Sequence, residues 1–152
     1  MPTDNDYLIA IARYLAADDT LFNLVDGKIN VNYPESEITK GLGQSATQTL
    51  IGVSFASRLS AGRLGAYTHK LKEVRPVIQI DVASLYGGNA SYCEQVVDRI
   101  EDIVFYDIDY VLGGYTYHIF VENLKSTTYW DSEIKCWHGI ISINGLYIRT
   151  AT

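Results

Sequence analysis

Residues 77–104 decide the fold, and they read VIQIDVASLYGGNASYCEQVVDRIEDIV. Within Val77–Leu85, isoleucine and valine alternate with more polar residues, which predicts a strand with one apolar face. Gly87–Gly88 ends the strand, and a helix capped near Asn89 or Ser91 is expected next, with Ser91 and Glu94 at the spacing of a capping box. The apolar residues that follow recur every three or four positions, with acidic residues on the opposite side. The stretch therefore predicts a strand, a glycine junction and a helix that packs on a sheet.

One helix, a short second turn and two strands are expected ahead of this stretch. Thr3 and Asp6 stand at capping-box spacing, and the apolar residues that follow them lie three and four positions apart. Asp18–Asp19 closes this amphipathic helix and caps a short second turn over Thr20–Val25. The two strands are expected at Lys28–Asn32 and Gln48–Ser57, the second of which is rich in β-forming residues.

Two long connections separate these elements. Residues 33–47 are polar and contain glycine and proline, and residues 58–75 are rich in glycine, serine and basic residues without a clear period. Long connections in a domain are usually functional or disordered. Residues 58–75 hold five basic residues and one acidic residue, whereas the rest of the chain holds seven basic and seventeen acidic residues. Residues 58–75 are therefore named the basic segment.

Strands also dominate the last third of the chain. Tyr115–Leu124 and Ile134–Ile148 are rich in tyrosine, isoleucine and valine, and Lys125–Ser132 is expected to interrupt them. Asn144–Gly145 suits a tight hairpin, but too few residues follow it for a full return strand, so one long strand with a bulge or kink is preferred. The order of elements predicts a single α+β domain over residues 1–152, with a mainly antiparallel sheet and helices packed on one face.

The composition indicates an ordinary globular protein and argues against a dedicated nucleic-acid binder. The 152 residues are 47% hydrophobic, and the net charge is −6, whereas nucleic-acid binding requires a basic footprint. The N-terminus lacks a basic region followed by an apolar stretch, and no apolar run is long enough for a membrane helix. We therefore expect a protein made in the cytoplasm, without a secretory leader or a membrane anchor.

No motif predicts a metal, a nucleotide or a nucleophilic serine. His69, His118 and His138 are far apart in the sequence and lie in different predicted elements, which favours structural or surface roles. Gly87–Gly88 joins a strand to a helix, as some phosphate-binding loops do. A third glycine, a nearby lysine and a later acidic residue for a ribose are missing, so glycines that permit the turn are the favoured interpretation.

The acidic pairs and the cysteines do not indicate catalysis either. Asp98 and Asp102 are one helical turn apart on a polar face, where solvated charge is usual. Residues 107–109, Asp-Ile-Asp, are expected in the loop after the helix, with no histidine or lysine nearby in sequence. Cys93 and Cys136 form no paired motif and are expected to be reduced, buried thiols. The sequence thus predicts a protein that is not an enzyme and uses no cofactor.

Aromatic residues gather after residue 114 and indicate a contact surface. Tyrosine and tryptophan add large contact area at small entropic cost, and about half of these are expected in the core. Alternation places Tyr115 and Tyr117 on one face of their strand, and His118 and Phe120 on the other. Helices on one side of the sheet would leave the other side for a partner.

The order of these features resembles the tail-terminator, or tail-completion, family of long-tailed bacteriophages. Residues 76–88, PVIQIDVASLYGG, and the helix to Val104 are similar to a family strand of the form vxIdVws that enters a glycine junction and an amphipathic helix. Asp26–Ile29 resembles the start of the first family strand, and Trp137–Ile143, WHGIISI, resembles the final one. The similarity follows nearly the whole chain in order.

The resemblance implies the subunit of a ring, expected to be hexameric, on top of the finished tail tube. Such a ring stops tube polymerisation and joins the tail to the head, and DNA passes through it without sequence-specific binding. The implied partners are other copies of the chain, the tail-tube protein and the head-closure or connector protein. The implied location is the neck of the virion, after assembly in the host cytoplasm. No catalytic residue belongs to the family.

A ring requires one patch on each subunit to meet a different patch on its neighbour. A basic segment on an acidic body supplies such a pair of patches, and we expect it to bind an acidic surface of the next subunit or of the tail tube. The residues expected at the subunit or tail-tube interface are Arg58, Arg63, Lys70, Lys72, Arg75, Tyr115, Tyr117, Tyr129 and Trp130.

Three other interpretations remain open at this point. The chain could be another neck protein, such as a head-closure or stopper ring, or it could be a tail-tube subunit that polymerises by itself. A small enzyme or ligand-binding α+β domain that uses Gly87–Gly88 is a third possibility. Ring formation, tube formation and ligand binding distinguish the three.

Overall fold

The computed structural model describes residues 3, 5–31, 49–57, 77–84, 90–132 and 136–151. The elements within them are α1 (Asn5–Ala16), α2 (Asp19–Leu24), β1 (Ile29–Val31), β2 (Thr49–Ser57), β3 (Val77–Ser84), α4 (Ala90–Val104), β4 (Ile108–Leu112), β5 (Tyr115–Asp131) and β6 (Cys136–Ala151). Residues 33–47, the basic segment, Gly87–Gly88 and His69 lie outside this description.

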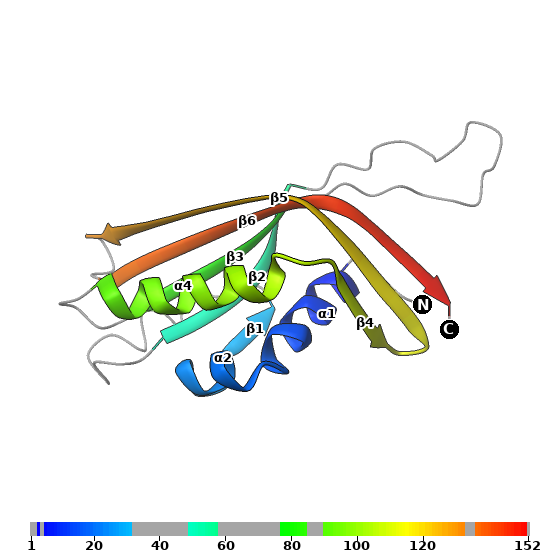
Figure 1. Cartoon of the computed structure of the whole chain (residues 1–152), viewed down its shortest axis with the longest axis horizontal. Helices are drawn as coiled ribbons and strands as arrows, with labels where there is room; N and C mark the ends of the chain where they lie inside the picture. The colour runs from blue at the N-terminus through cyan, green and yellow to red at the C-terminus, as the bar shows by residue number, and fades with distance from the viewer. Residues whose placement is uncertain are drawn as a thin grey trace.

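The six strands form one mixed sheet in the order β1-β2-β3-β6-β5-β4. Only β1 and β2 pair in parallel, and the other four strand pairs are antiparallel. The helices α1 and α4 lie against the same face of this sheet, which curls around them (Figure 1). The predicted α+β fold, with a mainly antiparallel sheet and helices on one face, is confirmed.

The predicted starts of α1 and α2 are confirmed by their hydrogen bonds, whereas the capping box at Ser91 is wrong, because Ser91 lies inside α4. The backbone nitrogen of Thr3 donates to Oδ2 of Asp6 at 2.8 Å, as in a capping box. Asp18 is the N-cap of α2, and its Oδ1 accepts from the backbone nitrogen of Leu21 at 2.8 Å. Arg99 of α4 donates to both carboxylate oxygens of Asp18 from Nε and Nη2, at 3.0 and 2.5 Å. One carboxylate therefore caps α2 and attaches it to α4.

The core lies between the sheet and the two longer helices. Alternate residues of β3 face it, and Ile78, Ile80 and Val82 are fully buried there, as their spacing predicts. At the other end of the core, the ring of Tyr7 in α1 meets the ring of Tyr117 edge to face, with centroids 5.1 Å apart. Each of these strands therefore presents one apolar face to the helices.

The longest strands depart from the sequence prediction. β5 continues through residues 125–131, where an interruption was expected, and pairs with β6 up to the contact of Asp131 with Cys136. β4 begins at Ile108, so the expected loop over residues 107–109 is wrong from that residue on. The preference for one continuous strand through Asn144–Gly145 is confirmed, but the irregularity lies in its partner β5, between Val121 and Asn123.

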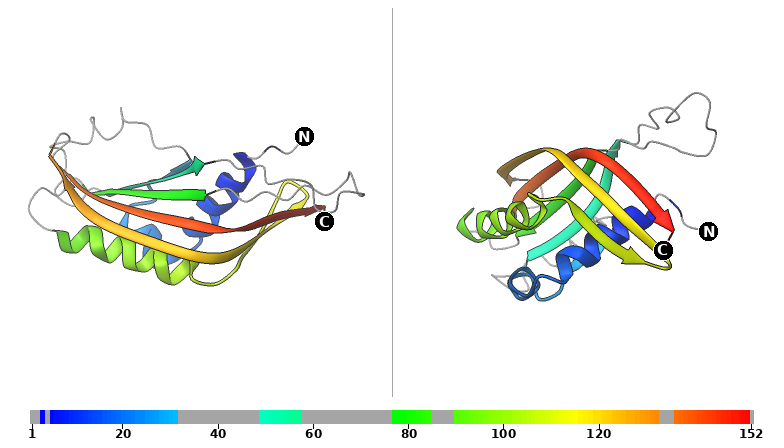
Figure 2. Two further views of the ribbon diagram at one scale, coloured as in Figure 1. Left: turned by 90° about the horizontal axis from the view of Figure 1, so that it is seen from above. Right: turned by 45° about the vertical axis from the view of Figure 1, so that its right-hand side comes forward.

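The bulge at Glu122 changes which residues of β5 face the helices. Before it, Tyr117, Ile119 and Val121 point inward, and their partners in β6 are Arg149, Tyr147 and Gly145. After it, the inward face belongs to even-numbered residues, because Leu124 is paired with the buried Ile143. A bulge adds one residue to one strand of a pair, so the two-residue alternation is interrupted once. Figure 2 shows β5 and β6 side by side along their length as they bend.

Candidate assembly surface

The outer half of β5 forms a strand arm with an open edge. β4 pairs only with Tyr115–Ile119, and Oδ1 of Asp107 accepts from the backbone nitrogen of Val121 at 3.2 Å just beyond this pairing. From Glu122 to Asp131, no strand in the described ranges pairs with β5 on the side away from β6. Residues 122–131 are named the β5 arm. Open strand edges are templates for pairing with another chain.

Side chains on both faces of the β5 arm are accessible. None of residues 122–131 is buried, whereas Tyr117 and Ile119 in the inner half are 1% and 0% exposed. Because its side chains are at most partly buried, the arm gains less from the hydrophobic effect in the isolated subunit than the inner half of β5 does. Its length and its β-forming threonine, tyrosine and tryptophan residues suit burial against a further protein surface.

Aromatic residues occupy the tip of this arm. Tyr129 and Trp130 are 40% and 39% exposed. The Tyr129 ring lies 5.5 Å from that of His138, and Trp130 meets Trp137 edge to face with centroids 5.5 Å apart. The cross-strand neighbours thus hold both rings in place while leaving part of each accessible. Rigid, partly exposed aromatic side chains are typical of the residues that dominate protein contacts.

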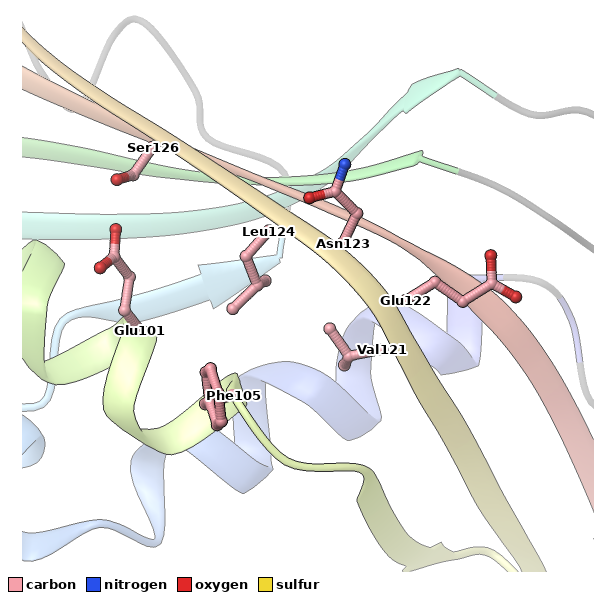
Figure 3. Close-up of a pocket in the computed structure, with 7 residues that line it drawn as sticks. All are labelled: Glu101, Phe105, Val121, Glu122, Asn123, Leu124 and Ser126. Atoms are coloured by element: carbon pink, nitrogen blue, oxygen red, sulfur yellow. The ribbon is translucent and has the colours of Figure 1, made fainter.

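A second candidate surface is a hollow between the end of α4 and β5, here named the α4–β5 hollow. Its volume is about 470 Å³, and it is lined by Glu101, Phe105, Val121, Glu122, Asn123, Leu124 and Ser126. Figure 3 shows Val121 and Leu124 pointing from β5 toward Phe105, and Glu101 pointing from α4 toward β5. Phe105 is 68% exposed although it forms part of an apolar floor. The hollow therefore has an apolar floor that is accessible to a partner.

The rim of the α4–β5 hollow is acidic. Glu101 stands at one end, and Glu122 points outward at the other (Figure 3). The last turn of α4 carries no basic residue. The last carbonyl groups of a helix have no partners within the helix, so they give its C-terminal end a partial negative charge. At the end of α4 this charge adds to that of the two carboxylates. The hollow therefore favours a cationic side chain next to an apolar one.

The cross-strand pairing of β4 and β5 brings together two polar residues that sequence reasoning kept apart. His118 Nδ1 lies 2.5 Å from Oδ1 of Asp109, and His118 Nε2 lies 3.2 Å from Oγ1 of Thr150. Asp109 has no histidine nearby in the sequence, but the pairing of β4 with β5 gives it one in the folded chain. Predicting β4 as a strand would have revealed this pair. The carboxylate is 68% exposed, so the pair contributes little to stability.

The described residues contain no group of three or more histidine, cysteine, aspartate or glutamate side chains able to hold a metal ion. The predicted burial of Cys93 and Cys136 is confirmed, and both are free thiols. Burial raises their pKa to about 12 and about 11. Nucleophilic cysteines require a lowered pKa, so neither thiol is activated. None of the helices in the described part of the chain is long and apolar enough to span a membrane.

The predicted interface residues are divided by the structure. Arg58, Arg63, Lys70, Lys72 and Arg75 lie outside the described residues. Tyr129 and Trp130 lie together on the β5 arm, and Tyr115 is half-buried, with the guanidinium of Arg149 5.7 Å from its ring centre. Tyr117 does not lie on a surface of this subunit, because it points inward from β5 against Tyr7 and is 1% exposed.

Two exposed aromatic residues were missed in the sequence. Phe105 and Tyr106 follow α4 directly, are 68% and 71% exposed, and contact each other edge to face. The helical spacing of apolar residues predicts which side of a helix is buried, but it does not apply to Phe105 and Tyr106, which come after the last turn. Their position after an amphipathic helix could have marked them as surface residues.

The comparisons with known proteins bear on the fold. No protein-family model matches the chain, and no curated protein matches it. Among solved structures, it is similar to a chain of the virion of a native gene transfer agent particle, with 16% identity and a TM-score of 0.56. The alignment covers 92% of this chain and 92% of that chain. The two chains therefore share a fold over nearly their whole lengths.

Proposed function

We propose that the chain is a structural virion protein and that it forms a ring, expected to be hexameric, that caps a phage tail tube. The ring ends tube polymerisation and joins the tail to the head connector. The observation that carries this proposal is the fold shared with a chain of a gene transfer agent virion over 92% of both chains. The order of sequence features that resembles tail terminators supports the finer assignment.

The candidate surfaces fit a ring. A closed ring joins two different patches, one from each neighbour. The β5 arm offers an open strand edge and two accessible aromatic residues, Tyr129 and Trp130. The basic segment offers opposite charge to an otherwise acidic chain. In a ring, a neighbouring protein would cover both surfaces.

The charge of the chain suits a passage for DNA. Outside the basic segment, the chain has seven basic and seventeen acidic residues. The net negative charge of this part repels the phosphate groups of DNA. In this proposal DNA passes through the ring without sequence-specific binding. The protein assembles in the host cytoplasm and remains in the neck of the virion, between the tail-tube protein and the head-closure or connector protein.

A tube-capping assay tests the proposal. The tail-tube protein of the same virion is polymerised with and without this chain, and tube lengths and ends are measured by negative-stain imaging. We expect shorter tubes with a distinct ring at one end. Long tubes made by the chain alone would identify a tube subunit, and rings that never bind tube ends would identify another neck protein. A monomer stabilised by nucleotide or phosphate in a thermal-shift screen would favour a ligand-binding domain.

A further inference from the structure

We propose that the α4–β5 hollow is the receptor for the basic segment of a second copy of this chain, and that Lys70–Lys72 of that copy is the part that enters. This inference rests on the proposed function, because it requires copies of the chain to assemble. It adds the receiving site and the residues that meet there.

The hollow has the shape and surface for a short apolar side chain. Phe105, Val121 and Leu124 form its floor, and Phe105 leaves 68% of its surface exposed in the isolated subunit. Burying a leucine on such a floor removes apolar area from water on both partners. The hollow adjoins the β5 arm, along which no described strand pairs on the side away from β6, and a strand edge of this kind can hold the backbone of an incoming segment.

The charges at the hollow specify what flanks that apolar side chain. Glu101 and Glu122 stand at opposite ends, and the end of α4 adds the partial negative charge of its last carbonyl groups. An incoming segment with a leucine between two basic residues would place one cation near each carboxylate. Lysine stems are long and apolar, so they can extend along the floor to the rim.

The basic segment contains one such sequence. Lys70-Leu71-Lys72 is the only place in residues 58–75 where a leucine stands between two basic residues. A receptor and a ligand carried by the same chain form the two different patches that a ring requires. Charge complementarity therefore points to a second copy as the occupant of the hollow.

Two charge-reversal variants test this inference. The receptor variant carries Glu101→Lys with Glu122→Lys, and the ligand variant carries Lys70→Glu with Lys72→Glu. Each alone places like charges at every contact, so we expect each to lose the ring seen for the unchanged chain at the same concentration and salt. Mixed in equal amounts, the two variants match at every contact of an alternating ring, and we expect the ring mass to return.

A matched control carries Glu94→Lys with Asp98→Lys, the same change in charge on exposed residues nearer the start of α4. We expect this control to keep the ring. Rings formed by both reversal variants would overturn the inference, as would rescue only when all four changes are in one chain, which would indicate docking within a subunit. If the unchanged chain forms no ring, the proposed function fails, and this outcome is distinct from failure of the hollow as receptor.

Discussion

Asp18 illustrates how much of this fold depends on single polar contacts. It accepts a hydrogen bond from the backbone nitrogen of Leu21 and holds the guanidinium of Arg99, so two helices share one carboxylate. The hydrogen bond from Arg99, with a smaller contribution from Leu21, holds the pKa of this carboxyl below its usual value despite partial burial. The sequence predicted the cap, because it is local. It could not predict the pair with Arg99, which is 81 residues away.

Replacement of Asp18 by alanine should lower the free energy of unfolding at pH 7 by about 1–2 kcal/mol, since it removes a cap and an ion pair. Asp18→Asn keeps a capping oxygen and should cost less. Because the folded-state pKa is lowered, the stability from the charge is present above the unfolded value, roughly pH 4, and is lost as the pH falls through the folded value. Urea unfolding at several pH values measures this. An equal cost for both variants at every pH would contradict the assignment.

At the level of the elements, the alternation of apolar and polar residues predicted the strands that have one buried face. It did not predict the outer part of β5, where no side chain is fully buried. The strand β3, Val77–Ser84, could be predicted because every second residue packs on the helices. In the β5 arm, exposed polar residues on both faces resemble a loop, and the bulge at Glu122 shifts the inward face by one residue. Pairing with β6 keeps residues 125–131 extended, and pairing between distant segments is not encoded in a local pattern.

The close packing of α4 on β6 should be visible in a glycine replacement. A Cβ at Gly139 would overlap a methyl group of Val97, so Gly139→Ala should lower the free energy of unfolding by about 1–3 kcal/mol. Denaturant unfolding measures the loss. Combining Gly139→Ala with Val97→Ala removes the overlapping methyl group, so the combined cost should be smaller than the sum of the two single costs. Strict additivity of the two changes would show that the overlap is not the cause.

The aromatic tip of the β5 arm should matter for assembly more than for folding. Tyr129→Ala with Trp130→Ala removes rings that are about 40% exposed, so the isolated subunit should lose much less stability than a core truncation causes. Ring mass at a fixed concentration should fall toward that of the monomer. Tyr147→Ala serves as the contrast, because Tyr147 is fully buried and its truncation should cost about 3–5 kcal/mol. If the double variant lost as much free energy of unfolding as Tyr147→Ala, the tip would be part of the core, and this would contradict the assignment.

At the scale of the whole molecule, the subunit is a curled sheet with α1 and α4 inside the curve (Figure 1). The β5 arm extends past the end of the pairing between β4 and β5. The fold class could be predicted from the sequence, because the periods of its helices and inner strands are clear. The α4–β5 hollow could not, since it joins Glu101 to residues of a strand that begins more than ten positions later and whose outer half has no alternating pattern. The surfaces left open in the subunit are the features that assembly would use.

The mass of the chain alone in solution tests the central claim of a closed ring most directly. Native mass measurement across protein concentrations, paired with negative-stain imaging, should find a single assembly at a fixed multiple of the 17.0 kDa subunit, expected to be six, with a central opening. Raising the salt concentration should dissociate the ring, because salt screens the attraction between basic and acidic residues at the contact. The screening length is about 10 Å at 0.1 M salt and becomes shorter as salt is added. A monomer at every concentration, or an open series of ever larger species, would contradict the claim.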